Sequence, residues 1–251
     1  MTTPHAAEGE EVGFRGRPPS GAYELAGLEP VDISQTPGTL ICLEGTDGVG
    51  RSSHAALLRE WLENEGYGVV YTELTVSPLV SEGLKRAKEG HTLGPLTMDL
   101  FYATDMADRL ETQVLPALRA GFVVLTDRYV YSSMARSIVR GSDPAWIEDA
   151  FRFAPKPDAV IYMDISMESL IPRALASDGF DYWESGRDFQ EERDIYRSFE
   201  HYQRRLLATY DKLADRFGFQ RVDANGTLGE VFPEIKRRVA EVLRATGVTP
   251  A

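Results

Sequence analysis

The sequence contains a single cysteine, Cys42, among 251 residues. One thiol cannot form a disulfide within the chain, and it cannot supply the several ligands of a thiolate metal cluster. A chain that does without internal disulfides is typical of a reducing compartment, so the sequence predicts a cytoplasmic protein. Cys42 itself stands in an apolar segment, where we expect it to be a small buried hydrophobic residue.

Long apolar runs and basic residues are also scarce. No window reaches the ~18 apolar residues of a membrane-spanning helix, and the first residues lack the basic and then apolar pattern of a secretory signal. The chain has 27 Lys and Arg against 39 Asp and Glu, a net charge of −12. This balance argues against a broad nucleic-acid or membrane surface, so any polyanion must bind in a local basic pocket.

The chain divides into a proline- and glycine-rich extension, residues 1–37, and a domain of alternating strands and helices, residues 38–248. The extension has no sustained period, and we expect it to be flexible. The domain pattern predicts an α/β fold with a parallel sheet, helices on both faces and ligands at the carboxyl ends of the strands. We expect strands at 40–43, 68–73, 121–126, 159–164 and 219–222, and helices at 54–65, 96–118, 132–139, 146–153, 167–176, 194–217 and 228–245.

The segment LICLEGTDGVGRSSHAALL reads as an apolar strand, a glycine turn and an amphipathic helix. It matches the phosphate-loop pattern GxxxxGK[ST], except that Arg51 stands where lysine is expected. The glycines permit close backbone approach, so N–H groups can converge on a phosphate at the start of the helix. The alternative is a tight connection without a ligand. We predict ATP binding, with Mg²⁺ held by Ser52, on the loop residues Gly45, Thr46, Asp47, Gly48, Val49, Gly50, Arg51, Ser52 and Ser53.

Arg51 changes what this loop is expected to do. An arginine keeps the positive charge, but it replaces a compact ammonium with a broad planar fork. We therefore expect phosphates to bind and phosphoryl transfer to be slow.

A second charged cluster, Asp127 and Arg128, follows the apolar run 121–126. In a doubly wound fold this strand end faces the phosphate loop. Asp127 is then placed to hold Mg²⁺ through water or to position the attacking oxygen, and Arg128 to bind a phosphate as a fork. A structural ion pair that closes the strand end is the alternative.

Four segments together resemble the thymidylate kinase family of nucleoside monophosphate kinases: LEGTDGVGRSS, FYATDMADRLETQVLPAL, TDRYVYSSMA and PKPDAVIYMDISMESLIPRA. They occur in the family's order and at about its spacing, from Thr39 to Val242. The resemblance implies a P-loop kinase fold with a five-stranded parallel sheet and a mobile lid. It also implies ATP and Mg²⁺ on the phosphate loop, a monophosphate acceptor across the cleft, and a homodimer.

Individual roles follow from the same resemblance. Asp47 is expected near the acceptor sugar and phosphate, Tyr102 stacks on the acceptor base, and Arg128 holds the acceptor phosphate. Ser52 and Ser53 match the hydroxyls beside Mg²⁺ and the α-phosphate. The other candidates on the acceptor side are Arg109, Asp127, Ser133 and Arg136.

The chain departs from the family pattern at four places. Arg51 replaces the loop lysine, and residues 73–75, Glu-Leu-Thr, stand in place of Arg-Glu-Pro. Met106 stands in place of a base-contacting arginine. Arg109 lies one helical turn further on and could reach the same face; the alternative is that Arg109 is a solvated surface residue. Residues 135–137, Ala-Arg-Ser, replace Ala-Tyr-Gln. Three of these changes fall on the acceptor side.

The segment 173–193 is punctuated by glycine and rich in arginines and acids, as expected of a lid that closes over phosphates. Gly48 stands where some relatives carry an arginine, so we expect the charge that stabilises the transition state to come from the lid. Arg173 and Arg187 are the first candidates and Arg193 is the third. A solvated helix face is the alternative.

The leading hypothesis is transfer of the γ-phosphoryl group of ATP to a nucleoside monophosphate, with thymidylate as the default acceptor. Catalysis would consist of positioning and charge neutralisation by Arg51, Asp47, Arg128 and the lid arginines. One alternative is a kinase of the same fold with a different phosphorylated or anionic acceptor, favoured by Arg136. Another is a catalytically weak nucleotide-binding regulatory protein, favoured by Arg51.

Overall fold

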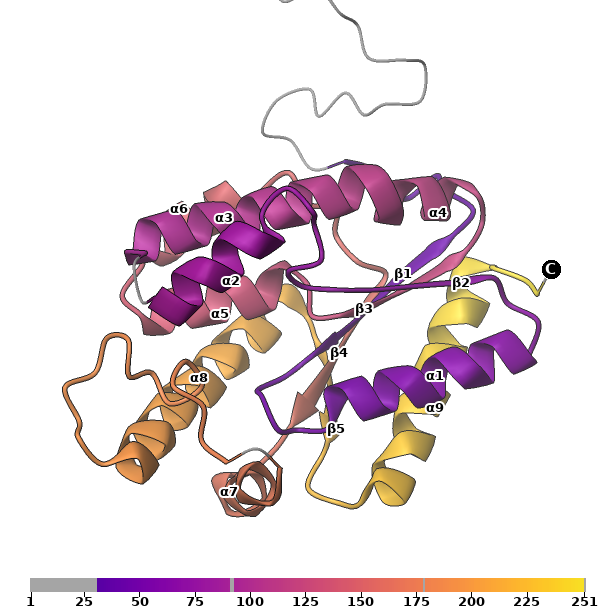
Figure 1. Cartoon of the computed structure of the whole chain (residues 1–251). Coiled ribbons are helices and arrows are strands. Elements are labelled where there is room, and N and C mark those ends of the chain that lie inside the picture. Colours follow the sequence, from indigo (N-terminus) through magenta and orange to yellow (C-terminus); the bar gives the residue numbers. More distant parts are fainter. Residues whose placement is uncertain (1–30, 91–92, 178, 251) are drawn as a thin grey trace, which may run out of the picture.

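A five-stranded parallel sheet lies at the centre of the computed structural model, which describes residues 31–90, 93–177 and 179–250 (Figure 1). The strands lie in the order β2-β3-β1-β4-β5, and each pairs in parallel with its neighbours. This confirms the predicted five-stranded parallel sheet. Because β1 is the middle strand, the glycine loop that follows it leaves from the centre of the carboxyl edge. The strands are β1 (Thr39–Glu44), β2 (Val69–Glu73), β3 (Val123–Asp127), β4 (Ala159–Asp164) and β5 (Gln220–Asp223).

Alternate side chains of β1 pack into two hydrophobic clusters on opposite faces of the sheet. Leu40 and Cys42 belong to one cluster, and Ile41 and Leu43 belong to the other. All four are fully buried, which explains why this strand reads as a continuous apolar run. The first face is covered by α3 (Pro95–Arg109), α5 (Val130–Val139) and α8 (Ile195–Phe217), and the second by α1 (Arg51–Asn64) and α9 (Leu228–Thr246) (Figure 1).

The helix expected at 96–118 is continuous but not uniform. It consists of α3, a π-helical turn at Leu110–Val114, and α4 (Leu115–Arg119). Pro116 has no N–H to offer and crowds the carbonyl one turn earlier, and a π turn relieves that conflict. Two further helices, α6 (Pro144–Ala150) and α7 (Met167–Ala176), lie close to their expected positions.

One helix, α2 (Ser81–Gly90), was not expected from the sequence. It buries only Leu84 and Ala87, so it carries too few apolar residues to show a helical period. Among the helices of the described residues, none combines the length and the apolar character that crossing a membrane requires.

Residues 31–37 lie against the domain. Ile33 is 9% exposed and belongs to the same cluster as Leu40. The Thr36 hydroxyl donates to the Ile33 carbonyl over 2.7 Å, and the Gly38 N–H donates to the Leu118 carbonyl over 2.9 Å. The end of the predicted extension therefore contributes to the core, while residues 1–30 fall outside the described residues.

We predict that Ile33→Ala lowers the free energy of unfolding by about 2 kcal/mol, because it removes buried methyl groups from the edge of the core. Urea denaturation of the full chain measures the change. Gln35→Ala, at an exposed neighbour in the same segment, is the control. An Ile33→Ala effect no larger than the control, within about 0.5 kcal/mol, would show that this segment is not part of the folded unit.

Candidate active site

The glycine loop between β1 and α1 lines a cleft at the carboxyl edge of the sheet. Gly45, Gly48 and Gly50 have φ angles of 150°, 77° and 91°, which side chains disfavour. Gly50 caps α1 without a side chain, so no capping group stands between the first-turn N–H groups and a phosphate. Of the predicted loop residues 45–53, all but Gly45 and Val49 line the cleft. Val49 instead packs its side chain into the core.

The Arg51 guanidinium is folded back against its own loop and is only 6% exposed. Its Nε forms an ion pair with Asp127, and its Nη1 donates to the carbonyls of Gly45 and Thr46 over 2.5 and 3.1 Å. Asp127 also accepts from the Ser52 hydroxyl over 2.6 Å. These contacts tie the glycine loop to the end of β3.

A second charged cluster in the cleft is a carboxylate between two arginines. Asp47 forms an ion pair with Arg128, and Nη2 of Arg136 donates to both Asp47 oxygens over 2.9 and 2.7 Å. Arg128 has a φ of 74°, an uncommon and strained conformation for a residue with a side chain. Burial, with a smaller effect of Arg136, lowers the pKa of Arg128 to about 10, so the guanidinium remains cationic at neutral pH.

Glu44 holds this part of the cleft in place. The carboxylate is fully buried at the end of β1 and accepts the N–H groups of Tyr129 and Ser132 over 2.8 and 3.2 Å. It also accepts the hydroxyls of Ser132 and Tyr210 over 2.5 and 3.3 Å. Burial raises the pKa of Glu44. Glu44 was not among the site residues predicted from the sequence, although an acid at the carboxyl end of a buried apolar strand is a recognisable signal.

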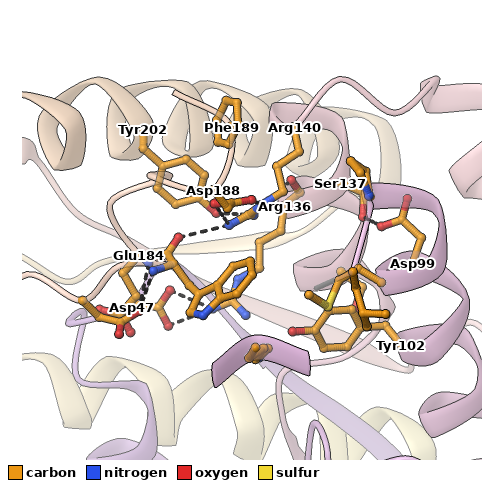
Figure 2. Close-up of a pocket in the computed structure, with 17 residues that line it drawn as sticks. Asp47, Asp99, Tyr102, Arg136, Ser137, Arg140, Glu184, Asp188, Phe189 and Tyr202 are labelled. Atoms are coloured by element: carbon orange, nitrogen blue, oxygen red, sulfur yellow. Dashed lines mark hydrogen bonds and ion pairs between the residues drawn. The ribbon is translucent and has the colours of Figure 1, made fainter. Parts of the chain in front are cut away.

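A deeper pocket continues from the cleft between α3, α5 and the segment 181–189 (Figure 2). Tyr102, which is 8% exposed, and Ser133 lie in its wall. The cleft and the pocket are contiguous, because both are lined by Asp47, Lys88, Tyr102, Arg136 and Glu184. The structure therefore offers a phosphate-loop compartment and an aromatic compartment, joined at the Asp47 cluster.

Comparison with known proteins agrees with this arrangement. The family model for thymidylate kinase matches residues 43–235. The chain belongs to the thymidylate kinase family. A probable thymidylate kinase 2 of Saccharolobus solfataricus is 36% identical over 208 residues, 82% of this chain and 97% of that protein. A probable thymidylate kinase of Thermococcus kodakarensis is 37% identical over 70% of this chain and 84% of that protein, and a thymidylate kinase of Clavibacter sepedonicus is 39% identical over 61% and 77%.

Met106, which departs from the thymidylate kinase pattern, and Arg109, the residue considered as its replacement, both lie in the core. Met106 and Arg109 are both fully buried, and neither lines the cleft or the pocket. The alternative of a solvated Arg109 is therefore wrong, and its predicted substrate contact has no support. Its Nε donates to the Thr72 hydroxyl over 3.2 Å, and Nη1 lies 3.8 Å from Asp105. Asp105 in turn accepts the N–H of Thr75 over 2.9 Å, so this buried pair supports the loop after β2.

The segment 173–193, which the sequence predicts to be a lid, is bound to the end of α5 and to α8. Arg140 binds both oxygens of Asp188 over 2.7 and 3.2 Å and donates to the Tyr202 hydroxyl over 2.9 Å. The Gln203 amide donates to the Glu184 carbonyl over 2.9 Å. Arg140 was not selected from the sequence, because its lid partners are distant along the chain.

The three lid arginines differ in position. Arg173 lines the cleft and donates to the carbonyls of Val49, Asn225 and Gly226 over 3.3, 2.9 and 2.7 Å. Arg187 lines neither compartment, and it donates to the Arg193 carbonyl over 3.4 Å. Arg193 also lies outside both. Of the three, Arg173 is thus the one that the fold brings to the phosphate loop.

We predict that Glu44→Gln costs less than about 1 kcal/mol of folding free energy, while Glu44→Ala costs about 3 kcal/mol. Glutamine can still accept the two N–H groups through its carbonyl oxygen, whereas alanine leaves both buried donors without a partner. Urea denaturation of the matched pair measures the difference. Equal losses in the two variants would contradict the view that Glu44 acts through these hydrogen bonds.

Proposed function

We propose that this protein transfers the γ-phosphoryl group of ATP to thymidylate, forming ADP and thymidine diphosphate. The observation that carries the proposal is the contiguity of the phosphate loop with the Tyr102 pocket, which meet at the partly buried cluster of Asp47, Arg128 and Arg136. Nη1 of Arg128 in that cluster is buried and has no hydrogen-bond partner within the described part of the chain. A buried donor without a partner costs free energy unless a ligand satisfies it, and an acceptor phosphate does so. The relatives named thymidylate kinase support thymidylate as the acceptor.

On the acceptor side, Arg128 and Arg136 bind the monophosphate and Tyr102 stacks on its base. Asp47 holds both guanidinium groups in position and offsets one of their two positive charges. The attacking phosphate oxygen is already ionised, so no strong general base is needed. The work of this side is to place that oxygen in line with the γ-phosphoryl group.

On the donor side, the backbone amides of the glycine loop and the start of α1 bind the phosphates of ATP. The Ser52 hydroxyl and the Asp127 carboxylate, hydrogen-bonded over 2.6 Å, are a donor set that fits Mg²⁺, which prefers hard oxygen ligands. When bound there, the ion neutralises charge on the β- and γ-phosphates. Arg173 lines the cleft and donates to the Val49 carbonyl of the loop, which supports our assignment of Arg173 as the lid cation for the transferring group.

We also propose a compartment and an oligomeric state for this protein. Cys42 is buried and unpaired, which supports a reducing compartment, the cytoplasm. A homodimer stays a prediction from the family resemblance. Leu96 and Leu100, 59% and 50% exposed one turn apart on α3, support it as an apolar stripe on the surface.

We predict that Arg128→Ala raises the KM for thymidylate by about 10- to 100-fold and leaves ATP affinity nearly unchanged. The loss corresponds to one charge-assisted phosphate contact of about 1.5–3 kcal/mol. Steady-state kinetics and calorimetric titration of ATP measure the two effects. Arg59→Ala, on the exposed side of α1, is the control. A parallel fall in ATP affinity would contradict the assignment of Arg128 to the acceptor.

We predict that Arg51→Lys raises the single-turnover rate about 10-fold, which is about 1.4 kcal/mol of barrier. The guanidinium is fixed on Asp127 and the loop carbonyls, and its planar donors follow the migrating phosphoryl group less well than a flexible ammonium does. Arg51→Ala should weaken ATP binding, because the positive charge is lost.

Single-turnover rates with saturating ATP and thymidylate compare the three proteins. A slower lysine variant would mean that the site is built around the guanidinium. ATP binding with no turnover in any of the three would instead support a nucleotide-binding regulatory protein.

A further inference from the structure

A buried carboxyl group lies at the end of the pocket that is remote from the phosphate loop. Asp99 is 4% exposed and lies on α3 one turn before Tyr102. Its Oδ1 accepts the Ser137 hydroxyl, and its Oδ2 accepts the Ser142 hydroxyl over 2.8 Å. Figure 2 shows Asp99 and Ser137 at the Tyr102 end of the pocket, with Asp47 and Glu184 at the other end.

Asp99 differs from Asp47 and Asp188 in its partners. Those two acids are each paired with arginine, whereas Asp99, like Asp181 and Glu184 of the same pocket, belongs to none of the ion pairs found in the described part of the chain. Its two hydroxyl bonds leave lone pairs unused on both oxygens, since an ionised carboxylate accepts at about four positions and donates at none. A ligand in the pocket therefore meets an acceptor there.

Two further polar residues of the pocket differ in their partners. The Arg140 guanidinium is bound to Asp188, the Tyr202 hydroxyl and the Trp183 carbonyl. Ser133, one turn before Ser137 on α5, is 3% exposed. Its hydroxyl is buried without a hydrogen-bond partner in the described structure, and the residue lines the pocket.

We propose that Asp99 determines base specificity by accepting the N3–H of thymine, while the Ser133 hydroxyl donates to a neighbouring carbonyl oxygen of the base. This inference rests on the proposed function. Thymine presents one N–H donor between two carbonyl acceptors, which is the complement of a carboxylate beside a free hydroxyl. Cytosine presents a lone pair at N3, which the carboxylate repels. Tyr102, three residues from Asp99 on the same helix face, stacks on the base that Asp99 reads.

Two measurements test the inference. In the unchanged protein, calorimetry should show that N3-methyl thymidylate binds about 10- to 100-fold more weakly than thymidylate, as expected for a lost charge-assisted hydrogen bond. In Asp99→Asn, the preference for thymidylate over deoxycytidylate should fall by a similar factor, because an amide can turn either its oxygen or its N–H toward N3. The N3-methyl analogue should lose little further affinity in this variant.

The control is Asp108→Asn, the same chemical change on the same helix at a position that lines neither compartment. It should leave both ratios unchanged. Binding of the N3-methyl analogue within 3-fold of thymidylate would overturn the inference, whether or not Asp99→Asn folds. Unchanged nucleotide preference in a folded Asp99→Asn would overturn it too. Failure of the unchanged protein to form ADP and thymidine diphosphate would instead overturn the proposed function, which the binding ratios do not measure.

Discussion

The buried carboxylate of Glu44 is the contact on which the acceptor side of this molecule depends. It stands at the end of the central strand and collects donors from the turn after β3, from α5 and from α8. The Ser132 and Tyr210 hydroxyls also contact each other, and the Tyr210 hydroxyl donates to the Gly45 carbonyl over 3.3 Å, so the groups around Glu44 form one buried network. In such a network, losing the shared acceptor leaves buried donors unsatisfied at a cost in free energy. The backbone of Arg128, just before the bonded N–H of Tyr129, is fixed in its left-handed conformation by the same turn. The strain at Arg128 is thus maintained by hydrogen bonds that Glu44 receives.

Carboxylates offset part of the positive charge in the cleft. Arg51 is paired with Asp127, and Arg128 and Arg136 share Asp47, so three guanidinium groups contact two carboxylates. We expect nucleotide phosphates to bind by exchanging partners with these acids. The local excess of arginine provides a basic site on a chain whose net charge is −12. Because a phosphate replaces a carboxylate at each arginine, its binding free energy is the difference between the new ion pair and the lost one. Each arginine therefore contributes less to nucleotide affinity than an unpaired arginine would.

The sequence predicted the features that depend on residues close together along the chain, such as the bounds of strands and helices. The bounds of β4 and α7 were predicted to the residue, because each has a clear apolar period and clear ends. The orientation of Arg51 was not predictable, since its partner Asp127 is 76 residues away along the chain. The burial of Arg109 was missed for a similar reason: an arginine in a helix pattern reads as surface unless its polar partner on β2, Thr72, is known.

The face of α3 explains how the departures from the family pattern fit together. Asp99, Tyr102, Met106 and Arg109 recur at helical spacing, and all are at most 8% exposed, so they form one stripe facing inward. The first two line the pocket and the last two lie in the core. The pocket therefore ends along α3 between Tyr102 and Met106. Up to that point α3 lines the pocket with Pro95, Met98, Asp99 and Tyr102, and Asp99 is the charged residue among these four.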